Sequence, residues 1–293
     1  MSQLGQALGY GLISAAILGL SAMAMTLQFG VTRHVNFAHG ELLTIAAFAM
    51  IVAQHVTDNL LFDTLVAVVA STVAAGLLNL LVLRPFRRAT DRLSVMLIVT
   101  FAVSQIIQNL LALGFGLNYV VLNVPIEVAK HVGPFLWTSL DEVIIIAAMC
   151  VFALTFVLLQ YTSFGRAQRA VADDPVLARV VGIKSNRVIW QTWLLVGALT
   201  GLAGAALAMT TSVFNNQLGF NYLLVTFAAI IVGGLGKVHG ALVGALIIGL
   251  VTEVSGSYLE SGYKQVFALL LLVVVLLVRP TGIFKTLIPD TKA

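Results

Sequence analysis

Residues 161–189 read Y-T-S-F-G-R-A-Q-R-A-V-A-D-D-P-V-L-A-R-V-V-G-I-K-S-N-R-V-I, a charged stretch between two long apolar runs. The stretch holds five basic and two acidic residues, so most of it must lie in water rather than in lipid. The apolar runs on either side are long enough to cross a bilayer, which takes about 20 helical residues. The stretch therefore separates two predicted membrane helices.

The same stretch carries start and stop signals for two short helices. Thr162 or Ser163 can cap the first helix. That helix should stop just before Asp174, because a residue that precedes proline avoids the α region. Asp174 can then cap a second helix that has Pro175 at its first position. Gly182 is a natural terminator for this second helix.

Three charged residues of the first short helix, Arg166, Arg169 and Asp173, share one face at helical spacing. A structured, charged helix–break–helix on one side of a membrane protein is typical of a docking surface. The alternative is an ordinary basic loop that only fixes the topology of the chain.

The composition indicates a polytopic all-α membrane protein. The chain has 293 residues, of which 60% are hydrophobic and 10% charged. The apolar residues run continuously instead of alternating, which excludes a β-barrel. No stretch is left for a soluble domain, so we expect residues 1–293 to form one transmembrane domain of about eight to nine helices. The candidate spans are residues 8–30, 40–56, 62–83, 93–113, 141–161, 189–211, 222–236, 240–257 and 264–279.

The basic residues predict the orientation of these spans. Residues 84–92 are placed in the cytoplasm, and the other loops are assigned to alternating sides of the membrane. Of the 16 lysines and arginines, only Lys130 and Lys264 then lie outside. This split follows the positive-inside rule. It predicts an external N-terminus, a cytoplasmic C-terminus and a cytoplasmic 161–189 stretch. The residues predicted inside are Arg33, Arg84, Arg87, Arg88, Arg92, Arg166, Arg169, Arg179, Lys184, Arg187, Lys237, Arg279, Lys285 and Lys292.

Two polar interruptions break the apolar pattern. Residues 31–41 read V-T-R-H-V-N-F-A-H-G-E, and residues 232–240 read V-G-G-L-G-K-V-H-G. Irregular backbone at membrane depth survives only where protein or a water-filled cavity surrounds it. Short, glycine-interrupted segments in corresponding positions of two halves indicate a transport pathway, and the shared His-Gly at 39–40 and 239–240 suggests an internal repeat. The alternative is that both interruptions are tight cytoplasmic turns.

The interruptions supply the candidate pathway residues. An ionisable residue inside a membrane is a functional hypothesis by default. Asn36 and His39 would share a face if both were helical, whereas Glu41 would point elsewhere. An interfacial pair near a loop is the alternative for His39 and Glu41, and Glu253 carries the same two interpretations. The candidates are Asn36, His39, Glu41, Gly233, Gly234 and Gly236.

No pattern in the sequence supports enzyme chemistry or a cofactor. Gly236-Lys237 is followed by Val238 and lacks the upstream glycine of a phosphate-binding loop, so ATP would have to bind to another chain. The histidines lack metal-ligand spacing. The net charge of +4 comes from loop residues that topology explains, so nucleic acid is not an expected partner.

The motif Asn36-Phe37-Ala38-His39-Gly40-Glu41 resembles the signature of the LivH-type permeases, the membrane subunits of branched-chain amino acid ABC importers. The partner permeases of the LivM type are similar in fold but lack this form of the signature. Further motifs match in the order and spacing of the family and span nearly the whole chain. They are Arg84-Pro85, Gln108-Asn109-Leu110, Gly165-Arg166-Ala167-x-Arg169-Ala170 with Asp174, Gly182-Ile183, Gly233-Gly234-Leu235-Gly236, Gly240-Ala241, Tyr263-Lys264 and Arg279-Pro280-Thr281-Gly282.

This resemblance implies a type II-like ABC importer permease fold in a bacterial inner membrane. The implied partners are a LivM-like permease or a second copy of the chain, two cytoplasmic ABC ATPases, a periplasmic solute-binding protein and membrane lipid. The implied solute is a branched-chain or related amino acid, although related permeases carry urea, short amides or aromatic acids. Residues 161–189 would form the coupling-helix loop. Its implied ATPase-coupling residues are Gly165, Arg166, Arg169, Asp173, Asp174 and Gly182.

The chain departs from the family pattern at Lys237-Val238-His239 and at Lys285, both on the predicted cytoplasmic side. An ion-coupled secondary amino acid transporter is the rival interpretation, with His39, Glu41 and Glu253 as coupling groups. Such a carrier needs no capped docking stretch, and the sequence has few intramembrane acids. A membrane scaffold without transport would not need two broken-helix regions.

Overall fold

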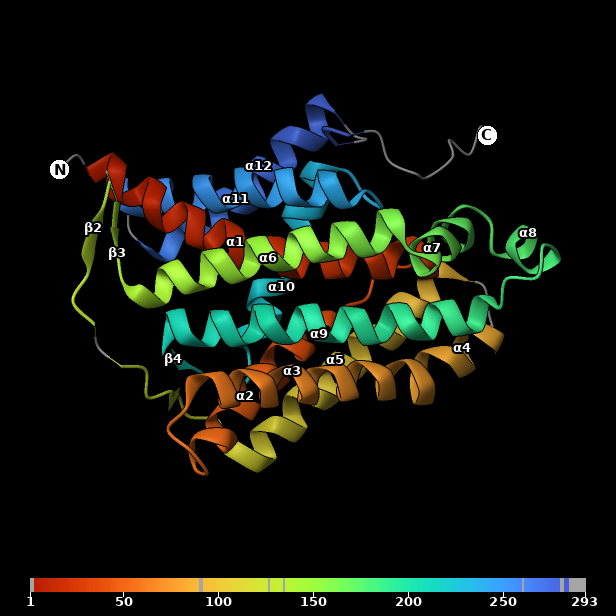
Figure 1. Cartoon of the computed structure of the whole chain (residues 1–293), viewed down its shortest axis with the longest axis horizontal. Helices are drawn as coiled ribbons and strands as arrows, with labels where there is room; N and C mark the ends of the chain where they lie inside the picture. Colours follow the sequence, from red (N-terminus) through yellow and green to blue (C-terminus); the bar gives the residue numbers. More distant parts are fainter. Residues whose placement is uncertain are drawn as a thin grey trace. The chain divides into compact units, whose positions relative to one another are not determined.

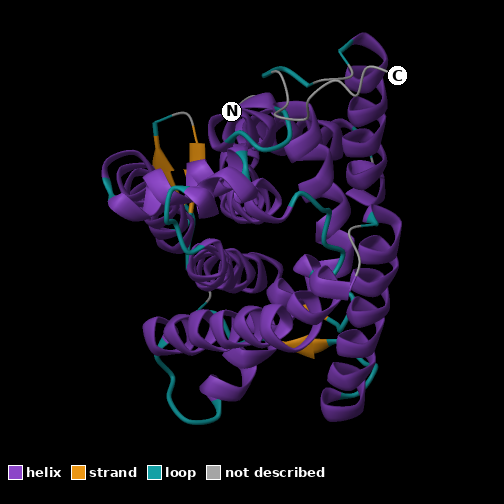
Figure 2. Ribbon diagram, turned by 90° about the vertical axis from the view of Figure 1, so that its right-hand side faces the viewer, coloured by secondary structure: helices purple, strands orange, loops and turns teal. Residues whose placement is uncertain are grey.

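The computed structural model describes residues 3–89, 92–125, 127–133, 135–259, 261–279 and 282–284, most of them helical (Figure 1, Figure 2). Lys285, Lys292 and Pro280-Thr281, which the sequence analysis used, lie outside these residues. The longer helices are α1 (Gln3–Thr32), α2 (His39–Gln54), α3 (Leu60–Leu77), α5 (Leu93–Phe115), α6 (Ser139–Tyr161), α9 (Ser185–Thr211), α10 (Leu218–Gly233), α11 (Val238–Tyr258) and α12 (Lys264–Val278). The shorter helices are the π-helix η1 (Leu78–Leu83), α4 (Arg84–Ala89), α7 (Ser163–Asp173), α8 (Pro175–Val180) and the 3-10 helix η2 (Ser261–Tyr263).

The helices confirm the predicted all-α polytopic fold. Each predicted span corresponds to an apolar helix, and six stretches of helix within the described residues are long and apolar enough to cross a membrane. The shorter apolar helices are α2, α10 and α12. With 16 residues each, α2 and α10 extend about 24 Å at 1.5 Å per residue. They fall short of a hydrocarbon core of about 30 Å, as expected of the helices beside the two interruptions.

The helix of the predicted span 62–83 extends further than the sequence indicated. The helix that starts as α3 continues through η1 and α4 to Ala89. Pro85 would clash with the carbonyl of residue 81 in a regular α-helix, and the wider π turn lies directly before it. There the Arg84 N–H donates to the Asn79 carbonyl, five residues back. The basic residues Arg84 and Arg87 therefore extend a membrane helix.

The described residues also include four short strands that were not predicted. Strand β1 (Val120–Val121) pairs antiparallel with β4 (Val213–Phe214), and β2 (Lys130–Val132) pairs antiparallel with β3 (Phe135–Trp137). They lie in or beside the connections after α5 and α9. Strands of two or three residues leave no alternating pattern long enough to detect in a sequence.

Contacts between residues divide the chain into two units. Unit 1 comprises Met1–Thr26, Pro125–Phe156 and Leu224–Ala293, and unit 2 comprises Leu27–Val124 and Val157–Leu223. The boundaries cut α1, α6 and α10, so each of these helices contributes to both units. The prediction of a single transmembrane domain stays a prediction.

In unit 2, α9 packs along α2 and α3 through a row of glycines (Figure 1). A Cβ atom on Gly197 would lie 2.6 Å from the Thr72 Cα, and one on Gly204 would lie 2.6 Å from the Leu43 carbonyl oxygen. Small residues allow the backbones of membrane helices to approach this closely. The three helices form the packed core that positions the first interruption.

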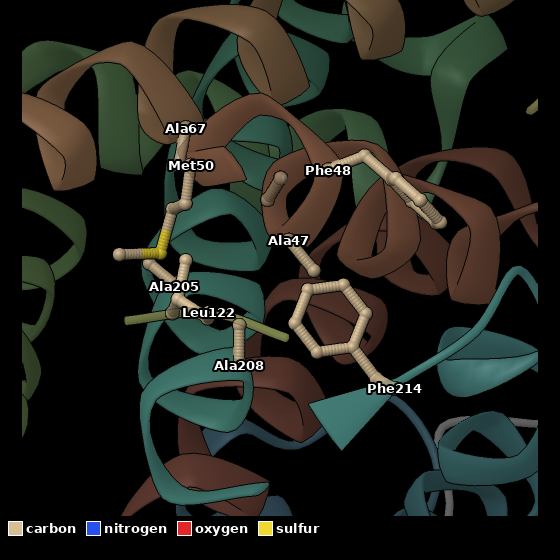
Figure 3. Close-up of a cluster of buried hydrophobic side chains, with 9 residues drawn as sticks. Ala47, Phe48, Met50, Ala67, Leu122, Ala205, Ala208 and Phe214 are labelled. Atoms are coloured by element: carbon tan, nitrogen blue, oxygen red, sulfur yellow. The ribbon is translucent and has the colours of Figure 1, made fainter. Parts of the chain in front are cut away.

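A buried apolar cluster extends this core towards the β1–β4 pair (Figure 3). The Phe48 ring of α2 packs edge-to-face on Phe214 of β4, with ring centroids 5.7 Å apart. Aromatic pairs prefer this geometry because the positive ring edge meets the negative ring face. The cluster comprises Ala46, Ala47, Phe48, Met50, Ala67, Leu122, Ala205, Ala208 and Phe214.

In unit 1, α11 packs against α1 and α12. A Cβ atom on Gly249 would lie 2.6 Å from the Ala15 amide nitrogen of α1. The Lys264 ammonium forms an ion pair of 2.7 Å with Glu253, and Ser14 donates a hydrogen bond of 2.9 Å to the same carboxylate. Glu253, which the sequence left open as a functional acid, thus joins three helices of unit 1.

Candidate functional site

The first break, residues 33–38 between α1 and α2, is held by polar side chains. The Asn36 Oδ1 accepts the Ala38 N–H at 3.0 Å, and the Asn36 Nδ2 donates to the Gln28 Oε1 at 3.2 Å. Both side chains are buried. Asn36 lies in the turn before α2 and forms an Asx-type contact, so the predicted helical face shared with His39 does not form. The Asn36 side chain instead ties the turn to the end of α1.

The second feature of this region is a buried polar cluster around Glu41, in the first turn of α2. The Glu41 Oε1 accepts from the Ser104 Oγ at 2.9 Å and from the Gln108 Nε2 at 3.3 Å, while Oε2 accepts from the Thr44 Oγ1 at 3.4 Å. The Thr44 Oγ1 also accepts the Gly219 N–H at 3.1 Å. These donors are neutral, and they satisfy a carboxyl group that is fully buried. The Glu41 cluster, defined as Glu41, Thr44, Ser104 and Gln108, thereby joins α2, α5 and the start of α10.

Gly40 brings the backbones of α2 and α10 together beside the Glu41 cluster. A Cβ atom on Gly40 would lie 2.5 Å from the Gly219 carbonyl oxygen. Real Cβ atoms are not found so close to a backbone oxygen, so only glycine fits. Gly40 and His39 are both buried. The His-Gly pair of the signature therefore marks a close helix crossing.

The second break, residues 234–237 between α10 and α11, is held by backbone. Gly234 and Gly236 have φ of +108° and +86°, a region that side chains with a Cβ rarely adopt. A Cβ atom on Gly233 would collide with the Gly240 carbonyl oxygen. The Phe284 N–H donates to the Gly233 carbonyl at 3.2 Å, so the segment after α12 also pairs with this break.

The structure therefore places the six candidate pathway residues in two regions. Asn36, His39 and Glu41 lie in unit 2, whereas the three glycines in or next to the second break lie in unit 1. Asn36 is hydrogen-bonded to Gln28, and Glu41 is hydrogen-bonded to side chains of α5. A role for the six residues in lining a translocation pathway stays a prediction.

The two short helices predicted in residues 161–189 are present as α7 and α8, together called the docking segment (residues 163–180). The Thr162 Oγ1 accepts the Gly165 N–H at 3.2 Å, which confirms the predicted first cap. Asp174 separates the helices and caps α8, with Pro175 at its first position. Gly182 follows with φ of +87°. The predicted caps, break and terminator are all confirmed.

Asp174 is an electrostatic feature of the docking segment as well as a cap. Its Oδ1 accepts the Leu177 N–H at 3.0 Å and the Val176 N–H at 2.7 Å. These backbone bonds, that of Leu177 foremost, lower the pKa of the Asp174 carboxyl below its ordinary value, and Arg33 and Arg179 add to the shift. Hydrogen bonds to the ionised form favour ionisation. The cap is therefore a carboxylate at neutral pH.

The two arginines of α7 bind the end of α6. The Arg166 Nη1 donates to the Tyr161 carbonyl at 3.4 Å, and the Arg169 Nη1 donates to the Leu159 carbonyl. The last carbonyls of a helix lack intrahelical partners, and basic side chains commonly satisfy them. Gly165 permits this contact because a Cβ there would collide with the Leu159 carbonyl. The G-R-A-x-R motif thus closes a membrane helix, a role that the sequence analysis missed.

The helix α8, labelled in Figure 1, carries an exposed apolar face that was not predicted from the sequence. Val176, Leu177, Val180 and Val181 are 60–77% exposed. Clustered exposed aliphatic side chains are typical of a contact site. The signal was present in P-V-L-A-R-V-V, which puts aliphatic residues at positions i, i+1, i+4 and i+5 of a helix. We call these four residues the α8 patch.

Known proteins resemble the chain over nearly its whole length. The family model described as branched-chain amino acid transport system / permease component matches residues 7–276. The high-affinity branched-chain amino acid transport system permease protein LivH of Escherichia coli strain K12 is 31% identical, over 93% of this chain and 92% of that protein. The corresponding protein BraD of Pseudomonas aeruginosa is 28% identical, over 95% of this chain and 94% of that protein. The ribose import permease protein RbsC of Bacillus subtilis is 33% identical over 46% of this chain. No solved structure matches the chain significantly.

The matches agree with the geometry of the molecule. The described residues include six stretches of apolar helix of membrane-spanning length, and the chain carries the two breaks and the capped docking segment where the LivH-type resemblance places them. The family model covers all of these features. The chain therefore belongs to the family of branched-chain amino acid transport system permease components.

Proposed function

We propose that the chain, a multi-pass permease component of an ABC transport system in the inner membrane, imports branched-chain amino acids. The names of the relatives from E. coli and P. aeruginosa support this solute class. We propose as partners a LivM-like permease or a second copy of the chain, two cytoplasmic ATPases and a periplasmic binding protein. The N-terminus would lie outside and the C-terminus in the cytoplasm, as the charge distribution predicts.

The observation that carries the proposal is the α8 patch within a capped docking segment. Leu177 and Val180 are 61% and 77% exposed on a helix that connects two membrane spans, and Asp173 and Arg179 are exposed beside them. An apolar centre with a polar rim is the usual composition of a protein interface. The sequence has no phosphate-binding loop of its own, so a separate ATPase is the partner that this surface suits.

The individual coupling residues then take different roles. The α8 patch would contact the ATPase directly, with Asp173 at its rim. Arg166 and Arg169 would act by holding the docking segment against α6. Gly165 would allow that contact, and the remaining two, Asp174 and Gly182, would define the ends of α8.

The docking proposal is tested by co-purification of the ATPase with a Leu177→Ser, Val180→Ser double variant. Full burial of one such side chain is worth about 1.5–3 kcal/mol, and each 1.4 kcal/mol corresponds to about a tenfold change in affinity. We expect at least about a tenfold loss of bound ATPase. Val128→Ser is the matched control, because Val128 is 87% exposed but lies in the predicted outer loop. Equal retention in both variants would contradict the proposal.

The solute is tested by uptake of labelled leucine, isoleucine and valine in cells that carry the complete transporter as their only route. Unlabelled urea, a short amide and an aromatic acid serve as competitors. We expect competition only among the aliphatic amino acids. Uptake of urea or the amide in their place would refute the proposed solute class while leaving the permease assignment intact.

The contacts of the candidate coupling groups do not favour an ion-coupled carrier. Glu253 forms an ion pair with Lys264, and Glu41 is hydrogen-bonded by neutral side chains of α2 and α5. Uptake that stops on ATP depletion but persists when the proton gradient is dissipated supports the ABC mechanism. The opposite pattern would support the carrier.

For the translocation pathway, we propose that the two breaks set its shape. Asn36 would act in the first break, and His39 and Glu41 would act in the first turn of α2 that follows it. Gly234 and Gly236 would act by letting the backbone turn sharply in the second break, and Gly233, the last residue of α10, by allowing the close approach of Gly240.

A further inference from the structure

We propose that Arg33 is a positioning residue that couples the docking segment to the first break, so that the two move as one rigid piece. The inference rests on the proposed function, because it gives a route by which ATPase docking reaches the interior of the permease. In the sequence, Arg33 is recognisable only as one positive charge among many. All of the contacts that support its new role lie within unit 2.

The Arg33 side chain reaches the end of α7. Its Nη2 donates to the Ala172 carbonyl at 3.0 Å and to the Asp173 carbonyl. These are the last two residues of α7, whose final carbonyls lack intrahelical partners. A cation at the C-terminus of a helix also complements the helix dipole. The Arg33 guanidinium therefore caps α7 from 139 residues away in the sequence.

The backbone of Arg33 is held in an uncommon conformation. Its φ is +54°, in the left-handed region that residues with a Cβ rarely adopt. Glycine would adopt this conformation without strain, so an arginine here points to a requirement for the side chain. The same turn leads directly to Asn36 of the first break. One strained residue thus connects the end of α1, the first break and the end of α7.

Apolar packing reinforces this junction. Val31 lies in a buried cluster with Val171 of α7, Ala178 of α8 and Val188 of α9. Beside it, a Cβ atom on Gly30 would lie 3.8 Å from the Ala172 Cβ. Close-packed interfaces transmit displacement because they deform little. A movement of the docking segment should therefore carry the end of α1 and the Asn36 turn with it.

The first test separates the guanidinium from the backbone in the complete transporter. Arg33→Gly keeps the left-handed turn but removes the side chain. We expect the ATPase to stay bound and ATP hydrolysis to continue, while solute imported per ATP hydrolysed falls at least about tenfold. Arg33→Lys keeps the charge but loses the planar guanidinium group with its paired donors. Its coupling ratio, defined as solute imported per ATP hydrolysed, should lie between those of Arg33→Gly and the unaltered chain.

Arg279→Gly is the matched control for the loss of charge at a helix end. Arg279 is exposed and follows α12 in unit 1, so its replacement should leave solute imported per ATP unchanged. A coupling ratio in Arg33→Gly that equals that of the control would overturn the inference. Because the readout is a ratio, a lower amount of folded transporter does not change it.

The second test replaces the lost contact with a covalent one. Gly30→Cys and Ala172→Cys, in a Cys150→Ala background, would place two Cβ atoms at the 3.8 Å separation given above, which is typical of a disulfide. Intact mass after mild oxidation reports the bond. We expect the disulfide to form, to leave uptake normal when Arg33 is present, and to restore coupling to Arg33→Gly. A role confined to stability would not give that restoration.

Three results of the second test would overturn the inference. They are a failure to crosslink, a loss of uptake on crosslinking while Arg33 is present, and a crosslinked Arg33→Gly chain that stays uncoupled. The docking proposal fails separately. If the α8 patch variant keeps its ATPase, docking is refuted whatever Arg33 does. If it loses the ATPase while Arg33→Gly couples normally, only the Arg33 inference is refuted.

Discussion

The first break, between α1 and α2, and the second break, between α10 and α11, interrupt apolar helices in similar ways but are stabilised by different contacts. In the first, the buried Asn36 side chain bonds Gln28 and the Ala38 amide. In the second, the packing is of backbone on backbone, with Gly233 against the Gly240 carbonyl. A turn made by side chains is sensitive to the loss of a hydrogen-bonding group, whereas a turn made by glycines is sensitive to the addition of any side chain.

The comparison also limits the internal repeat suggested by the two His-Gly pairs. The glycines do correspond, since Gly40 crosses Gly219 and Gly240 crosses Gly233 at distances that exclude a Cβ. The histidines differ, because His39 is buried and His239 is exposed. Only the close backbone crossing is common to the two breaks. The two His-Gly motifs therefore share a backbone contact but do not form the same functional site.

The largest expected effect is from Gly233→Ala, next to the second break. The new methyl group would collide with the Gly240 carbonyl, and backbone cannot move aside as a flexible side chain can. We expect a loss of about 3 kcal/mol in the free energy of unfolding, the upper range for overpacking, seen as a lower melting temperature in detergent. Gly114→Ala in α5 is the control, since no described atom lies within 4 Å of the added Cβ. Equal melting temperatures would show that the crossing tolerates a side chain.

The second-largest loss of stability is expected from Asn36→Ala in the first break. Asn36→Ala removes a buried acceptor from Ala38 and a donor from Gln28, and an unmet buried polar group costs about 1–3 kcal/mol. Lys237→Ala is the counterpart in the second break, where the Lys237 side chain makes no capping bond to a described residue, so a change within about 0.5 kcal/mol is expected. Thermal unfolding of both variants measures the difference. A Lys237 variant as unstable as the Asn36 variant would remove the distinction between the breaks.

A smaller effect is expected from Glu41→Gln, which tests what the buried carboxyl does beside the first break. The amide keeps one oxygen that Ser104 and Gln108 can share but leaves Thr44 without the second acceptor, so the loss of stability should be about 1 kcal/mol, the value of a typical hydrogen bond. Glu41→Ala should cost more, because Ser104, Gln108 and Thr44 all lose their acceptor. If Glu41 only holds α2 on α5, uptake by Glu41→Gln will follow the amount of folded transporter. A folded but inactive Glu41→Gln variant would favour a pathway role.

The smallest effect is a pH dependence of the stability of the α8 N-terminus, in the docking segment beside the first break. Because the pKa of Asp174 is lowered in the folded chain, its capping contribution is present above the ordinary value of about 3.9 and is lost as pH falls through the folded value. Amide-exchange protection of Val176 and Leu177 should fall below about pH 4. Asp174→Asn should abolish this dependence, since asparagine also caps a helix but does not titrate there. The Gly234 amide of the second break, bonded to Ile230, should show no such change.

Local interactions explain what was predictable from the sequence. Membrane helices need long apolar runs, so the spans were evident from composition. The Thr162 and Asp174 caps and the Gly182 terminator act over two to four residues, so their signals are contiguous in the chain. The glycines of the second break were recognisable because left-handed backbone favours glycine. The LivH-type resemblance was likewise carried by short motifs and is supported by the family match.

The amino-acid sequence by itself thus determined the helices, their ends and the positions of the two breaks, because each depends on neighbouring residues. Only the tertiary structure decided which distant groups meet. Glu41 finds Ser104 63 residues further along the chain, and Arg33 finds the end of α7 139 residues away. A buried polar group must find a partner, but its own sequence neighbourhood does not specify which one. That choice follows from the close packing of helices, which places one side chain and excludes the others.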